Sequence, residues 1–242
     1  MTEQIKIDFD KTIKTLSLSD DDVKLKKKFL EKFIENGFPS RKHENWKFSD
    51  INQIIQKNIG ELSFFNDYSS SSKIDTSIFI DGLEHNKIVF INGKVEKIDF
   101  NYEDQNNIQI NEISKSENKI ENENSLIDLN NAFTNKIYKI LIRKDYHLRK
   151  PLIIYHSTNT KIKSKNINTR LEFELEQNSS LRLIDYFSHM SEKNFINIFY
   201  NFDLKKGSIL KNYKVDKEKN KNIGYSFNNI IQDENSISEN FI

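Results

Sequence analysis

Apolar residues recur three to five positions apart along residues 20–36, the spacing that gives an amphipathic helix one buried face. Ser19 is placed to cap the start of this helix, and Gly37 suits the left-handed conformation that often follows a helix end. The pattern predicts a helix that begins near Asp20 and ends near Asn36. Its apolar positions are Val23, Leu25, Phe29, Leu30, Phe33 and Ile34.

A second, shorter helix is expected from about residue 51, with Ser49 or Asp50 as its cap. Residues 61–77 include a run of serines and are interpreted as a polar linker that does not pack. The region after this linker is expected to contain both strands and a helix. We predict short strands at 78–80, 88–91 and 95–98, a charged, Asn-rich stretch at 113–124 and a helix at 126–133.

From Lys136 onward, apolar and polar residues alternate with a period of two, which is typical of strands with one buried face. The alternation is clearest at residues 171–176, where Leu, Phe and Leu share one face. We interpret the opposite face, formed by Glu172, Glu174 and Glu176, as exposed to solvent. Turn signals recur at intervals of roughly 12 to 16 residues, which fits a sandwich, a barrel or a solenoid and does not choose among them.

These patterns divide the chain into three zones. Residues 1–60 form a helical region, residues 61–135 a linker and a mixed α/β segment, and residues 136–242 the first part of a β core. The fold class is therefore mainly β with an N-terminal α-helical region.

Charge and composition exclude several classes of protein. The chain has 37 basic and 36 acidic residues, so no overall field attracts it to nucleic acid or to a membrane surface. The run Lys24, Lys26, Lys27 and Lys28 is interpreted as a solvated helix surface. No apolar run is long enough to span a membrane, and Met1 to Asp10 does not resemble a signal peptide. We therefore expect a cytoplasmic protein.

Catalytic and metal-binding patterns are sparse. Cysteine is absent, which excludes disulfides and thiolate ligands within these residues. The five histidines do not show a spacing that places two ring nitrogens on one metal ion, and no glycine-rich phosphate loop occurs. We predict no catalytic, cofactor-binding or metal-binding residue, and interpret the chain as a non-enzyme.

The junction between the two predicted helices, residues 38–49, carries one of the two prolines and the sole tryptophan. On physical grounds Trp46 is expected to pack under the helix pair. Arg41 or Lys42 is then expected to pair with Glu44 or to stack on the indole ring.

The same junction resembles the N-terminal signature of the SufD family, within the SufB/SufD proteins of the SUF iron-sulfur cluster assembly machinery. The resemblance runs from Pro39 to Ser49 without a gap. Two further segments are similar to the family: an Asn-Gly hairpin element at residues 88–94, and a Leu-Asn-x-Ala-Phe helix end followed by Arg-Lys-Pro. The matching positions, whose roles the resemblance leaves open, are Pro39, Arg41, Lys42, Glu44, Trp46, Asn92, Gly93, Asn130, Ala132, Phe133 and Pro151.

The resemblance implies a right-handed parallel β-helix, incomplete at its C-terminus, in a non-catalytic subunit of the SufBCD scaffold. It implies pairing with SufB through the β-helix and coupling to the SufC ATPase through C-terminal helices that these residues do not contain. The iron-sulfur cluster is then assembled by the complex, and this chain alone binds no cofactor. We expect the chain to be an N-terminal portion of such a protein. The alternatives are a SufB paralogue and a β-solenoid enzyme acting on polysaccharide.

Overall fold

A computed structural model describes residues 2–42, 44–69, 71–113, 124–159, 162–189, 191–216 and 222–241. His43 and most of the charged stretch 113–124 lie outside these ranges. The helices are α1 (Thr2–Ile13), α2 (Asp20–Asn36), α3 (Ile51–Asn58) and α4 (Ser125–Phe133), with short 3-10 turns η1 (Glu44–Trp46), η2 (Thr76–Ile78) and η3 (Gln105–Asn107).

The helix ends follow the sequence signals. The Ser19 side chain accepts a hydrogen bond from the backbone N–H of Asp22, and Gly37 has a φ of 67° just after α2. Asp50, rather than Ser49, caps α3 by accepting from the backbone N–H of Gln53 at 2.9 Å. The predicted bounds of α2 and the predicted start of α3 are confirmed, because a local side chain or a local backbone conformation fixes each of these ends.

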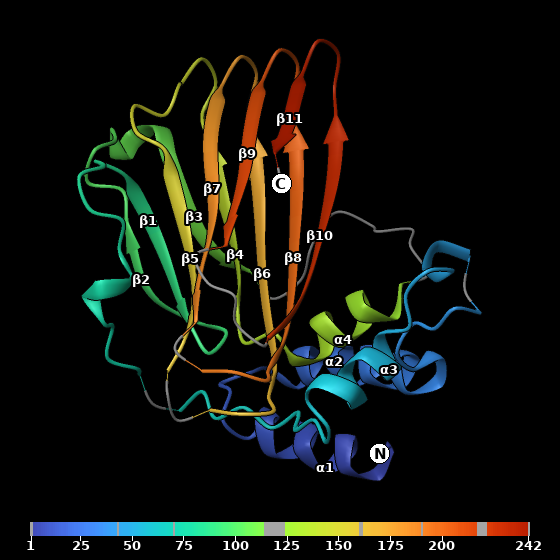
Figure 1. The fold of residues 1–242 in the computed structure, drawn as a ribbon. Coiled ribbons are helices and arrows are strands. Elements are labelled where there is room, and N and C mark those ends of the chain that lie inside the picture. Colours follow the sequence, from blue (N-terminus) through green and yellow to red (C-terminus); the bar gives the residue numbers. More distant parts are fainter. Residues whose placement is uncertain are drawn as a thin grey trace.

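The strands form two sheets that face each other (Figure 1). The first sheet has the order β11-β9-β7-β5-β1-β2, and the second has the order β10-β8-β6-β4-β3. From β4 onward, successive strands alternate between the two sheets, and strands of the same sheet pair in parallel. The strands are β1 (Asn86–Ile91), β2 (Lys94–Asp99), β3 (Ile108–Ile113), β4 (Ile137–Ile142), β5 (Leu152–Thr158), β6 (Asn166–Leu175), β7 (Ser180–His189), β8 (Phe195–Leu204), β9 (Ile209–Asp216), β10 (Ile223–Gln232) and β11 (Ile237–Phe241).

This arrangement is a β-solenoid of about three turns, preceded by helices. One turn, here called a rung, contains one strand from each sheet, and stacked residues are 28 to 33 positions apart in the sequence. The predicted class, mainly β with an N-terminal helical region and a parallel β-helix, is confirmed. The parallel pairing excludes the sandwich and the barrel, which the period-two pattern had left open.

The main core lies between the two sheets. Leu171, Phe173 and Leu175 point into it from β6, as the alternation predicts. The helices at the lower right of Figure 1 pack against the lower part of the opposite face of the second sheet. The helices and this face form a second core that contains Ile5, Phe9, Leu30, Phe33, Phe38, Ile51, Ile55, Ile59, Phe64, Leu126, Leu129, Ala132, Phe133 and Phe195.

The expectation that residues 61–77 do not pack is wrong for the first part of this segment, up to Tyr68, whereas most of the described residues after it are exposed. Phe64 and Tyr68 are buried, and the backbone N–H groups of Phe64 and Phe65 donate to Asp8 of α1 at 2.8 and 3.1 Å. A polar stretch can be held in the interior when its backbone finds partners there. The strand expected at 78–80 is also wrong, because this segment ends the η2 turn and packs Ile78 against the outer face of β1 and β5.

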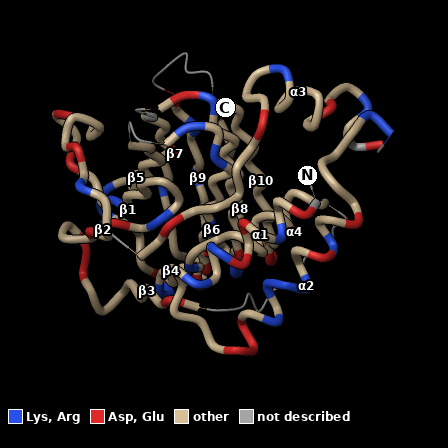
Figure 2. The backbone as a smooth tube through the Cα atoms, turned by 90° about the horizontal axis from the view of Figure 1, so that it is seen from below, with Lys and Arg blue, Asp and Glu red and all other residues tan. Residues whose placement is uncertain are grey.

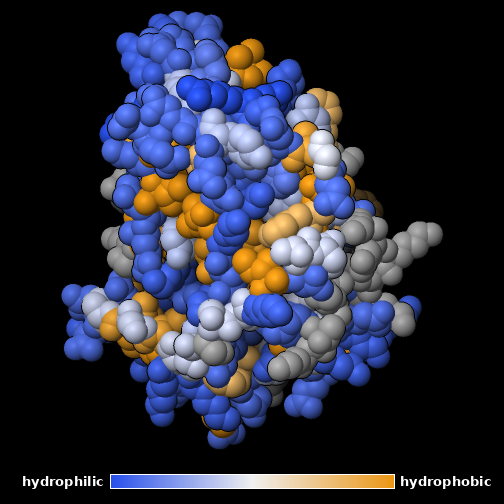
Figure 3. Space-filling model, turned by 90° about the vertical axis from the view of Figure 1, so that its left-hand side faces the viewer, coloured by the Kyte–Doolittle hydropathy of each residue, from blue (hydrophilic) through white to orange (hydrophobic). Residues whose placement is uncertain are grey.

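Both signs of charge are interspersed along the helices (Figure 2), in keeping with the nearly balanced composition. The face at the β2 side is mostly hydrophilic, with hydrophobic side chains showing through its middle (Figure 3). None of the described helices is long and apolar enough to cross a membrane.

Candidate interaction site at the last rung and the helix junction

The last rung consists of β10 and β11, which are the end strands of their sheets. The backbone N–H groups of Ile223 and Asp233 point towards β8. They donate to the backbone carbonyls of Asn194 and Leu204. Since successive residues of a strand point their backbone groups to opposite sides, the even-numbered residues of β10 point theirs away from β8. Within the described part of the chain, this outward row has no neighbouring strand.

The interior positions of the last rung differ from those beneath it. Ile196, Ile198 and Tyr200 of β8 lie in the core, whereas their partners on β10 are a glycine, a serine and an asparagine. The stacked apolar column therefore ends in small and polar side chains. Other large apolar side chains on the last two rungs are 40 to 48% exposed: Val215, Ile231, Ile237 and Phe241.

Asparagines stack between the rungs. The side chain of Asn229 donates to that of Asn201 at 2.7 Å, and the backbone N–H of Asn194 donates to the side chain of Asn222 at 2.8 Å. A weaker contact of 3.4 Å joins Asn212 to Asn240. Ladders of this kind favour the addition of strands in register, because the amide side chains repeat along the stack.

The helix junction meets this rung. Trp46 is partly buried and its ring lies 5.5 Å from that of Tyr225 on β10, so the expected tryptophan anchor is present. Pro39 is buried, and its carbonyl accepts a hydrogen bond from Ile51 at 3.1 Å. In contrast, Arg41, Lys42 and Glu44 are exposed, and none of the ion pairs found in the described ranges involves them.

The Asn-Gly element forms the hairpin turn that the sequence predicts. Asn92 and Gly93 have φ angles of 51° and 83° between β1 and β2. A Cβ atom at Gly93 would lie 2.9 Å from the carbonyl oxygen of Asn168, so the turn needs glycine for space as well as for conformation. Asn92 also accepts from the backbone N–H of Asn159 at 3.0 Å, which ties the turn to the chain that follows β5.

The helix-end positions dock α4 onto the second sheet. Asn130 is fully buried and donates to the carbonyls of Thr169 and Asn197 at 3.0 and 2.9 Å. Ala132 and Phe133 belong to the helical core. Pro151 lies elsewhere, just before β5, where its carbonyl accepts from Asn86. These positions are explained by packing, so the exposed charges of the junction are the part of the signature that packing does not explain.

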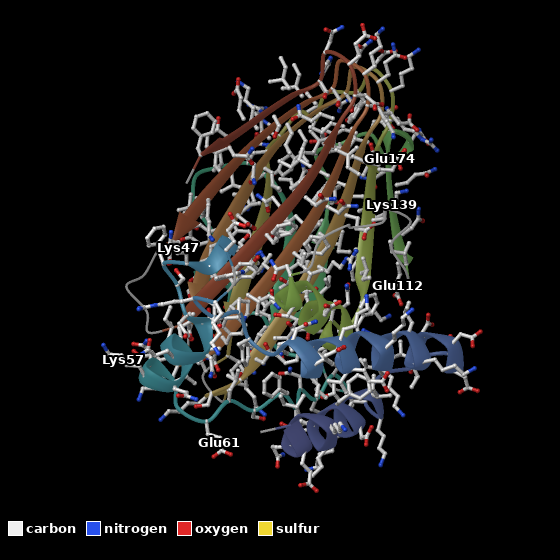
Figure 4. The ribbon with its side chains drawn as sticks, turned by 90° about the vertical axis from the view of Figure 1, so that its right-hand side faces the viewer. Lys47, Lys57, Glu61, Glu112, Lys139 and Glu174 are labelled. Carbon is white, nitrogen blue, oxygen red and sulfur yellow. The ribbon has the colours of Figure 1, made fainter. Side chains whose placement is uncertain are left out.

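The interpretation of Glu172, Glu174 and Glu176 as a solvent-exposed face is wrong for Glu172, which is 4% exposed and bonded to buried Arg170 at 2.8 Å. Arg170 also donates to Asn131 and lies 4.5 Å from the centre of the Phe199 ring. Glu174 and Glu176 are partly buried and pair with basic residues of β4 and of the segment after it. These pairs are Lys139 with Glu174 at 2.8 Å (Figure 4) and Arg143 with Glu176 at 3.1 Å.

Lys26 was expected to be solvated with the rest of its lysine run, and this is wrong too. It is partly buried, and its ammonium group donates to the carbonyls of Thr134 and Asn131 at 2.6 and 3.2 Å. Desolvation, followed by the neighbouring charge of Arg170, lowers the pKa of Lys26 to about 8. The helices are therefore docked over buried charge as well as over apolar surface.

A polar cluster inside the solenoid was not predicted. Nε2 of buried His156 lies 3.0 Å from Asp185 Oδ1 and 2.7 Å from the Tyr200 hydroxyl. The imidazole stacks between the rings of Phe90 and Phe187. Burial, and then the neighbouring Asp185, raise the pKa of Tyr200 well above its ordinary value. No sequence signal joins these residues, because they lie on three strands that only the coiling brings together.

His147 and His156 do not form a common site in the structure. Nδ1 of His147 lies 2.9 Å from the Ser180 hydroxyl, whereas His156 is held by the interior cluster. Within the described ranges, no group of three or more His, Cys, Asp or Glu side chains is arranged to hold a metal ion. A scan against known protein-family models found no match for this chain, and a search of curated proteins found no match either.

Proposed function

We propose that this chain is a non-catalytic subunit of a SufBCD-type scaffold in the cytoplasm, which pairs with SufB and is coupled to the SufC ATPase. Two features support the proposal. The motif positions from Pro39 to Pro151 resemble SufD, and a helical region followed by a parallel solenoid is the architecture that this resemblance implies. The chain lacks cysteine, so the cluster is built on thiolates of other subunits.

The observation that carries the proposal is the outward backbone row of the last rung. The ten-residue register between β8 and β10 has no shift, so β10 presents a regular edge. A strand of a partner can add to such an edge through main-chain hydrogen bonds, and the asparagine ladder favours one register. We propose that this edge takes up the next strand of the stack, and that SufB can supply that strand when it meets the chain of 242 residues.

The test is co-expression with SufC and with either SufB or SufD, and capture through a tag on this chain. Asn228→Pro removes an outward-pointing N–H of β10 and leaves the hydrogen bonds to β8 in place. We expect it to reduce SufB capture by at least about tenfold. Asn228→Ala, which keeps the N–H, is the matched control and should capture SufB nearly as well as the unchanged chain.

Equal capture of SufB by the proline and alanine variants would show that the β10 edge is not the interface. Absence of SufB from the capture by the unchanged chain would refute the proposed function as a whole. Capture of SufD in place of SufB would favour the SufB-paralogue alternative. Thermal unfolding of each variant, which should stay close to that of the unchanged chain, shows that the solenoid is intact.

A further inference from the structure

The junction between α2 and α3 is a closed loop. The hydrogen bond from Ile51 to the Pro39 carbonyl joins its two ends, and the backbone N–H of Ser49 donates to the carbonyl of Trp46 at 2.8 Å inside it. The loop is held to the body of the protein by buried Phe38, which lies in the helical core, and by the contact of Trp46 with Tyr225 of β10. A loop fixed at both ends presents its outer side chains on a stable platform.

The outer side of this loop combines an aromatic ring with positive charge. Phe48 is 90% exposed, well above the other exposed large apolar side chains of the described residues. Arg41, Lys42 and Lys47 are exposed on the same loop, and Glu44 is its one exposed carboxylate. Lys47 and, on α3, Lys57 project from the same side of the molecule (Figure 4).

Folding does not account for these side chains. An exposed phenylalanine contributes little to stability, because its apolar surface stays in water. The cations of the loop take part in none of the ion pairs formed among the described residues. Exposed aromatic and arginine side chains, however, are the groups that carry binding energy when a partner covers them.

We propose that the loop formed by residues 39–51 is a docking surface for an acidic peptide segment of a partner protein. An apolar side chain of that segment covers Phe48, and its carboxylates lie against Arg41, Lys42 and Lys47. Charge complementarity selects the acidic partner, because the loop exposes three cations and one carboxylate, while its second carboxylate, Asp50, is partly buried and caps α3. This surface adjoins β10 through Trp46, but it is made of loop side chains and not of the outward backbone row, and its test does not depend on the proposed pairing with SufB.

Trp46 provides a direct readout, because it is the sole tryptophan of the chain and lies in the loop itself. The probe is a short synthetic peptide made of glutamate and leucine, titrated into the full chain while tryptophan emission is recorded. We expect a saturable change in emission that weakens as salt is added, because exposed charges are screened. A peptide in which lysine replaces glutamate should produce no saturable change.

Two variants locate the binding. Phe48→Ser and the double variant Lys42→Glu with Lys47→Glu should each weaken binding by about tenfold or more. Their matched controls are Leu83→Ser, at another exposed apolar residue, and Lys27→Glu with Lys28→Glu on the exposed face of α2. Both controls should bind like the unchanged chain. All the substituted residues are exposed, so thermal unfolding should be unaffected.

Any of three results would overturn the proposed docking surface. These are no saturable change in tryptophan emission with the acidic peptide, equal binding of the lysine peptide, or undiminished binding of the acidic peptide by both loop variants. None of these results bears on SufB capture, which uses a different edge and a different readout.

Discussion

The strands that form the edges of the solenoid differ between its two ends. At the first end, β2 and β3 run antiparallel to their neighbours, are only six residues long and carry charged side chains, and a register shift interrupts the β1–β2 pairing. At the last end, β10 is ten residues long, parallel and without a register shift. Short, bulged and charged edges discourage further pairing, whereas a long and regular edge permits it.

The two ends of the solenoid are therefore not equivalent for the addition of a further strand. The first end is terminated by its own antiparallel strands, whereas β10 at the last end carries no charged side chain and continues the asparagine ladder. Its companion β11 is shorter and carries Glu239, which pairs with Lys211 at 3.0 Å. Docking is therefore expected at one end only. Each prediction below compares an enclosed residue with a more open position on one of the last two rungs.

The largest expected difference is in core packing. Phe202 is fully buried and stacks on Phe173 at 5.1 Å, whereas Ile230, its register partner on the last rung, is only partly buried. Phe202→Ala should lower the free energy of unfolding by about 4 kcal/mol, and Ile230→Ala by less than about 1 kcal/mol. Chemical denaturation measures both. Similar losses at the two positions would mean that the last rung is as tightly packed as the interior.

A smaller difference is expected between two glycines. Gly93→Ala places a methyl group 2.9 Å from the Asn168 carbonyl oxygen at a φ of 83°, which should cost about 2 kcal/mol of stability. Gly224 on β10 has no atom within 4 Å of an added Cβ and no positive φ, so Gly224→Ala should be neutral or slightly stabilising. Urea unfolding curves decide the point, and a cost at Gly224 as large as that at Gly93 would contradict it.

An effect of about the same size is expected as a pH dependence at the docked helices. The pKa of Lys26 is lowered from 10.5 to about 8 by burial. Below about pH 8, Lys26 is protonated in both the folded and the unfolded chain, and the cost of burying its charge is fully present. As the pH rises from 8 towards 10.5 the unfolded chain binds more protons, so the contribution of Lys26 to the free energy of unfolding rises.

Comparison with Lys26→Met isolates this contribution. Between about pH 7 and about pH 10, the stability of the unchanged chain relative to the variant should increase by about 2 kcal/mol. Lys211 on β9 is the control, because its hydrogen bond to Glu239 raises its pKa instead, and its variant Lys211→Met should not reproduce the increase. A stability difference that stays constant with pH would show that Lys26 keeps its ordinary pKa.

The candidate site was predictable in part. The sequence identified the hairpin at Asn92 and Gly93 and the tryptophan anchor at Trp46, because each depends on a residue type that few positions can replace. It did not predict the burial of Arg170 and Glu172. Alternation assigns both residues to the outer face of β6, and only the helices packed on that face remove them from water.

The sequence by itself determined the local features of this protein: where the helices begin and end, which turns need glycine or asparagine, and which side of a strand is apolar. These follow from neighbours within a few residues. Only the tertiary contacts account for the parallel pairing of the strands, the burial of Phe64 and Tyr68, and the meeting of His156 with Asp185 and Tyr200. A period of two is common to every kind of sheet, so the pairing depends on contacts 28 to 33 residues apart that no local pattern encodes.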